Sequence, residues 1–105
     1  MTILTLDAAG PQIATEDDIR DIVGEAAFGG TTLVVIPAER LAPDFFRLSS
    51  GFAGAALQKF TNYHLQVAIV GDISAYTAHS APLRDFVAES NRRGEVRFLA
   101  TEAEL

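Results

Sequence analysis

Two continuous apolar runs are the clearest signal along the chain. Residues 32–36 (TLVVI) and 65–70 (LQVAIV) are rich in β-branched and other apolar side chains, and a proline or a glycine closes each run. Such runs are typical of strands that are buried on both faces of a parallel sheet. Because helical sequence separates them, the pattern predicts a parallel pair joined by a right-handed crossover.

Residues 16–28 carry the clearest helical pattern. Apolar side chains recur there every three or four positions with acidic residues between them, which is typical of a helix with one buried face. Thr15 stands three residues before Asp18, a near capping box that predicts where this helix begins. Gly29 and Gly30 supply its exit.

Two further helices are predicted from the same rules. The first has an apolar stripe that ends at about Thr61, and either Ser49 or Ser50 caps it. The second begins at the Ser80 cap, has a proline in its first turn, and ends by Gly94.

The remaining apolar segments complete an α/β pattern. Residues 3–6 predict a first strand, residues 96–99 predict a last strand, and residues 12–14 are the weakest candidate, as the second strand of a hairpin. Residues 101–104 have a capping-box signature, as if a further helix began there. The order β(β)αβαβαβ(α) predicts one α/β domain over residues 1–105, with a mostly parallel sheet of four to five strands and helices packed on it.

Composition and charge limit the function classes. The chain has no cysteine, and neither His64 nor His79 has metal-ligand spacing, so we expect no metal and no cofactor. The balance of 14 acidic against 8 basic residues gives a net charge of −6, which opposes binding to nucleic acid and to anionic membranes. No apolar run is long enough to span a bilayer and no signal peptide is recognisable, so we expect a cytoplasmic protein.

The strongest candidate site is a pair of hydroxyls flanked by glycine. Ligands of open α/β sheets bind beyond the carboxyl ends of the strands, beside helix N-termini. Ser49 and Ser50 precede Gly51 where a helix is predicted to start, and the free amides and dipole of a helix start favour an anion. A bound phosphate, or one attached to a serine, would be stabilised there. The alternative, which the residue types favour, is that a serine only caps the helix.

Two other polar residues are candidates for the same pocket. Asp72 follows Gly71 at the end of a predicted strand, where a carboxylate either binds a ligand or forms an Asx turn. Asn91 lies near the end of the third predicted helix, where it either recognises a ligand or makes hydrogen bonds to the last helical carbonyls and a neighbouring loop. For both residues the structural role is favoured.

A short turn over residues 43–46 is the candidate partner surface. Pro43 opens it, and it is more hydrophobic than a loop requires. We expect one phenylalanine ring to fill the core and the other to be exposed, so that Asp44, Phe45 and Phe46 contact a partner protein.

Longer motifs resemble a known bacterial family. They are LAPDFFRL at 41–48, SGFAG at 50–54, QKF at 58–60 with Asn62 and Tyr63, VAIVGD at 67–72, LRDFV at 83–87 and ESN at 89–91. On these motifs the chain resembles DUF4180, a family of domains of unknown function, over about residues 17–105. The resemblance implies neither an activity nor catalytic residues.

A more remote resemblance concerns the serine pair alone. The strand, the loop, the Ser49-Ser50-Gly51 segment and the later strand look like the STAS domains of anti-sigma-factor antagonists. In those domains a serine before the glycine of an Asp-Ser-Ser-Gly motif accepts phosphate and controls partner binding. The resemblance implies that Ser50 is the acceptor, although Leu48 stands where that motif has its aspartate.

Three hypotheses for function remain open. The first is a non-enzymatic, STAS-like regulatory module whose protein partner binds at the Ser50 helix end and is controlled by phosphorylation. The second is a small-molecule or phospho-ligand binding protein, or a weak enzyme, with a pocket lined by Ser50, Gly51, Asp72 and Asn91. The third is a homo-oligomer that pairs through its sheet edges. No nucleophile elbow, phosphate-binding Gly-Lys-Ser loop, dinucleotide fingerprint or zinc motif occurs, which favours a non-enzyme.

Overall fold

An all-parallel sheet of four strands forms the centre of this computed structural model, which describes residues 2–105. The strands are β1 (Ile3–Thr5), β2 (Leu33–Pro37), β3 (Gln66–Val70) and β4 (Val96–Leu99), and they lie in the sheet in sequence order. Every crossover therefore steps in the same direction, and right-handed connections place the intervening helices on one face of the sheet.

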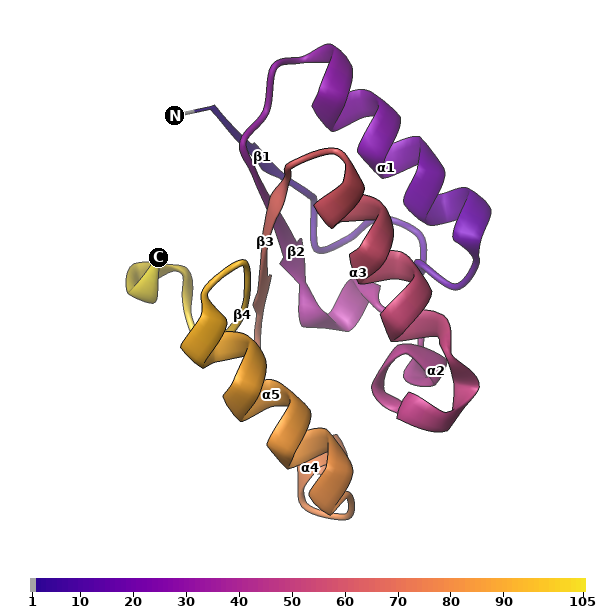
Figure 1. Cartoon of the computed structure of the whole chain (residues 1–105), viewed down its shortest axis with the longest axis vertical. Helices are drawn as coiled ribbons and strands as arrows, with labels where there is room; N and C mark the ends of the chain where they lie inside the picture. The colour runs from indigo at the N-terminus through magenta and orange to yellow at the C-terminus, as the bar shows by residue number, and fades with distance from the viewer. Residues whose placement is uncertain (1) are drawn as a thin grey trace.

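Helices alternate with the strands. They are α1 (Glu16–Phe28), α2 (Pro43–Phe46), α3 (Phe52–Asn62), α4 (Ser74–Thr77) and α5 (Ala81–Arg93), with short 3-10 turns η1 (Ala38–Arg40), η2 (Leu48–Ser50) and η3 (Glu102–Glu104). Figure 1 shows α1 and α3 side by side, with the C-terminal turn on the other side of the strands from them. The predicted α/β fold with a parallel sheet is confirmed, with four strands.

The alternation of side chains along each strand divides the apolar core between the two sheet faces. The larger cluster, on the helix side, includes Val34, Ile36, Val67, Ile69 and Phe98. The smaller one, on the opposite face, consists of Leu33, Val35 and Ala68. Because β2 is buried on both faces, its sequence is a continuous apolar run rather than an alternating one.

Side-chain caps fix the starts of α1 and α5, as predicted. The Asp18 carboxylate accepts hydrogen bonds from the amides of Ala14 and Thr15, and the Thr15 hydroxyl accepts one from the amide of Asp18, which completes the capping box. These hydrogen bonds lower the pKa of Asp18 below its ordinary value, and the bond from the Ala14 amide contributes most. The Ser80 hydroxyl accepts from the amide of Leu83 in the same way.

Two predictions for the N-terminal half need correction. Residues 12–14 do not form a strand, because Ile13 makes only an isolated bridge to Leu41. The N-cap of α3 is Gly51 rather than a serine. Its φ of +78° lies in the left-handed region, which glycine adopts at little cost, so the chain turns there instead of at the serines.

In the C-terminal half one helix end agrees with prediction and another differs. The helix α5 ends at Arg93, and Gly94 follows it with a φ of +87°, as predicted. Residues 101–104 do have the capping-box geometry, but they form a 3-10 turn. The short helix α4 was not predicted. Within residues 2–105, no helix has both the length and the apolar character that crossing a membrane requires.

Candidate functional site

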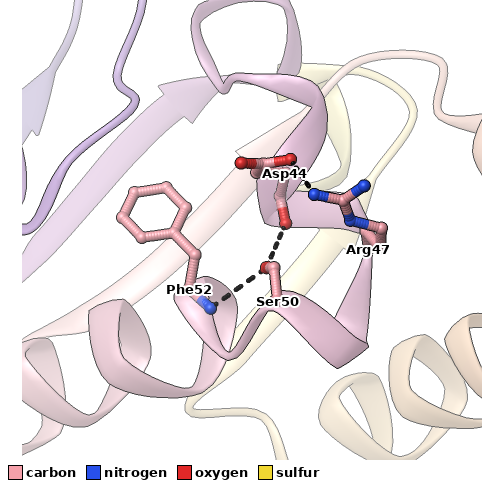
Figure 2. Close-up of polar contacts among 4 residues, drawn as sticks. All are labelled: Asp44, Arg47, Ser50 and Phe52. Atoms are coloured by element: carbon pink, nitrogen blue, oxygen red, sulfur yellow. Dashed lines mark hydrogen bonds and ion pairs between the residues drawn. The ribbon is translucent and has the colours of Figure 1, made fainter.

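The Ser50 hydroxyl joins two helices. It donates a hydrogen bond to the main-chain oxygen of Asp44 in α2 at 2.7 Å and accepts one from the amide of Phe52, the first residue of α3, at 3.2 Å (Figure 2). Ser49 and Ser50 are both exposed, and the left-handed Gly51 follows them. The serine pair is therefore open to solvent, and Ser50 stabilises the turn between α2 and α3.

The surroundings of Ser50 are acidic. A hollow of about 330 Å³ lies where the starts of α1 and α3 meet, and its lining includes Thr15, Glu16, Asp44, Ser50 and Gly51. The Asp44 carboxylate pairs with Arg47 at 2.6 Å (Figure 2), but both side chains are well exposed, so this ion pair contributes little stability. The two helix dipoles attract negative charge into the hollow, whereas the two carboxylates repel it. The Lys59 amine, 3.6 Å from the Glu16 carboxylate, offsets part of that repulsion.

Both phenylalanine rings of α2 are buried, which corrects the expectation that one of them is exposed. Phe45 is 3% exposed and Phe46 is 4% exposed. The Phe46 ring stacks on Tyr76 with a centroid distance of 4.3 Å, and the Phe45 ring meets Phe46 and Phe52 edge to face. Neither ring is available as a partner contact without unfolding α2, so only Asp44 of the predicted contact set lies at the surface.

Asp72 forms an Asx turn after β3. Its carboxylate accepts a hydrogen bond from the amide of Ser74 at 2.9 Å. Hydrogen bonds from Ser74 lower the pKa of Asp72, the hydroxyl contributing more than the amide. The Asp72 carboxylate is ionised at neutral pH. Asp72 also lines a polar hollow of about 370 Å³ at the strand ends, together with Gln12, Glu39 and Tyr76.

The Asn91 side chain binds a strand rather than a loop. Its Oδ1 accepts a hydrogen bond from the amide of Phe98 at 2.7 Å, and its Nδ2 donates to the carbonyl oxygen of the same residue at 3.3 Å. Phe98 belongs to β4, so α5 is fixed to the sheet by a main-chain contact. Both polar ends of the Asn91 amide are thereby engaged.

The candidates from the sequence thus lie in different places. Ser50 and Gly51 share the acidic hollow with Asp44, Asp72 lines a separate one, and the Asn91 amide is bonded to β4. The sequence analysis missed Glu16, which lies far from Ser50 in the chain and gives no local signal. Among residues 2–105, no group of three potential ligands of the His, Cys, Asp and Glu types is placed to hold a metal ion.

Comparison with known proteins gives one match. The family model described as "Domain of unknown function (DUF4180)" matches residues 1–105, the whole chain. No curated protein and no solved structure matches. The resemblance to STAS domains is therefore supported by no match.

Proposed function

Because this chain belongs to DUF4180, a family that brings no known activity, we propose from the geometry that it is a non-enzymatic, STAS-like regulatory module switched by phosphorylation of Ser50. One observation carries the proposal: an exposed serine hydroxyl holds α2 to the start of α3. Modification of that one oxygen acts on two helices together.

The chemistry of the Ser50 oxygen makes it a suitable switch. Esterification removes its hydrogen, so the bond donated to the Asp44 carbonyl is lost. The phosphate adds close to two negative charges beside Asp44 and Glu16, which line the same hollow and repel it. The start of α3 and the Arg47 guanidinium attract it instead. We therefore expect Arg47 to exchange Asp44 for the phosphate and the turn between α2 and α3 to rearrange.

Labelling followed by mass spectrometry tests the switch. A bacterial lysate with labelled ATP is expected to phosphorylate the wild type and Ser49→Ala at Ser50, and to leave Ser50→Ala unlabelled at that turn. Ser49→Ala is the matched control, because Ser49 is a neighbouring exposed hydroxyl. A protein partner that the wild type captures from the same lysate is expected to bind Ser50→Ala and Ser50→Asp with affinities that differ about tenfold or more. A Ser50 that is never modified, or equal binding by the two variants, would contradict the proposal.

The hollow beside Asp72 supports a second candidate function, binding of a small ligand. Its volume of about 370 Å³ is in the usual range for small-molecule sites, and Glu39 and Asp72 give it negative charge. That charge opposes a phospho-ligand and favours a cationic or hydroxyl-bearing one.

Binding of small amines tests this second candidate. Putrescine, spermidine and choline are expected to shift the NMR signals of residues 71–76, and Asp72→Asn is expected to weaken that binding severalfold. An asparagine keeps the oxygen that accepts from Ser74, so the turn is preserved while the charge is removed. Unchanged spectra at millimolar amine would exclude such a ligand.

A further inference from the structure

The two edges of the sheet differ in how their main-chain groups are satisfied. Successive residues of a strand direct their amide and carbonyl groups to opposite sides. In β1 the carbonyl of Thr2 and the amide of Leu6 bond to the β2 side, so the main-chain groups of Ile3 and Thr5 face outward. Within residues 2–105 these outward groups have no hydrogen-bond partner, and both residues are exposed.

A side chain closes part of the opposite edge, β4. The main chain of Glu95 and Leu99 bonds to β3, so the main-chain groups of Val96 and Phe98 face outward from the sheet. The Asn91 amide engages both the N–H and the C=O of Phe98, and thus takes the place that a further strand would occupy. Proteins protect a sheet edge in such ways against pairing with another chain, and here the β4 edge is protected at Phe98 while the β1 edge has no such cover.

We propose that β1 is a dimerisation edge, at which the β1 strand of a second copy of this chain pairs antiparallel to extend the sheet. This inference is independent of the proposed function. The segment over residues 2–6 (TILTL) contains no charge, no glycine and no proline, so two identical strands meet without repulsion. Ile3 is 48% exposed, and pairing would cover part of this apolar side chain.

The alternation of β1 fixes the register of this pairing. With the two-fold axis at Leu4, the outward groups of Ile3 lie opposite those of Thr5 in the second copy, and each amide meets a carbonyl. Both side chains are β-branched, which suits adjacent positions on neighbouring strands. A second copy therefore satisfies the outward amide and carbonyl groups of both Ile3 and Thr5, with a strand that this chain already provides.

The mass in solution tests the proposal directly. We expect light scattering after size-exclusion chromatography to give a dimer for the wild type at high micromolar concentration. Ile3→Pro removes an outward-facing amide without breaking a hydrogen bond to β2, and it should weaken association about tenfold or more while the circular dichroism spectrum persists. Ile3→Lys places a charge on the edge and should act in the same direction. Phe28→Lys is the matched control, because Phe28 is 96% exposed on α1 and lies outside the edge.

Engineered disulfides test the register. The chain has no cysteine, so a mixture of Ile3→Cys and Thr5→Cys proteins can form only designed links. Paired residues of this kind lie about 5.5 Å apart between Cα atoms, which a disulfide can bridge. The mixture is expected to cross-link severalfold faster than either variant alone or than Ala88→Cys on α5. A monomeric wild type, a dimer indifferent to both Ile3 variants, or equal cross-linking in all samples would overturn the proposal.

Discussion

Replacing Phe46 with alanine is expected to lower the free energy of unfolding by about 3–5 kcal/mol. The ring is 4% exposed, so its removal leaves a cavity between α2 and the rest of the core. It also removes the stacking on Tyr76, which connects α2 to α4. Urea denaturation followed by circular dichroism measures the change, and the loss is expected as a lower midpoint with an unchanged slope.

The control for this variant is Phe28→Ala. Phe28 is 96% exposed, so the same substitution there should alter the free energy of unfolding by no more than about 0.5 kcal/mol. Phe46→Leu, which retains most of the buried volume, should lie between the two. If Phe46→Ala proved as mild as Phe28→Ala, the ring would not be packed in the core, and a role for α2 as a contact surface would be open again.

The elements that the sequence predicts well are those determined by nearby residues. The bounds of α1 agree with prediction because Thr15 and Asp18 complete a capping box and the glycines follow. The two central strands were recognisable because burial on both faces requires an uninterrupted apolar run. In each case the physical cause lies within a few residues of the element itself.

The features that the sequence misses depend on contacts between distant segments. Nothing local to α2 indicates that Tyr76 provides a stacking partner and allows both Phe45 and Phe46 to be buried. Likewise, the partner of Asn91 lies on a strand that follows the helix, and the open edge of β1 becomes evident only when the strand order is known. At Ser50, the sequence correctly places a serine near a helix start, but the left-handed Gly51 moves the cap by one residue.

Asn91→Ala is the second substitution with a large expected effect. It removes the hydrogen bonds to both the amide and the carbonyl of Phe98, which are partly buried. A donor and an acceptor are thereby left without their partner, and we expect the free energy of unfolding to fall by about 1–3 kcal/mol. Urea denaturation of the wild type and the variant measures this fall.

The same variant should also acquire a new tendency to associate, because it opens the β4 edge. The outward main-chain groups of Phe98 are then free. Light scattering is expected to detect oligomers larger than those of the wild type, and their share should rise with protein concentration. Asn91→Asp keeps the acceptor for the Phe98 amide but sets a negatively charged oxygen against the Phe98 carbonyl near the C-terminal end of α5, so it should destabilise the protein at least as much. Asn62→Ala is the control for loss of an exposed helical asparagine, since within residues 2–105 the Asn62 side chain bonds only to Gln58 on its own helix. If Asn91→Ala were destabilised without any change in association, the side chain would stabilise the packing of α5 but would not protect the β4 edge. The difference between the two edges would then not explain which one associates.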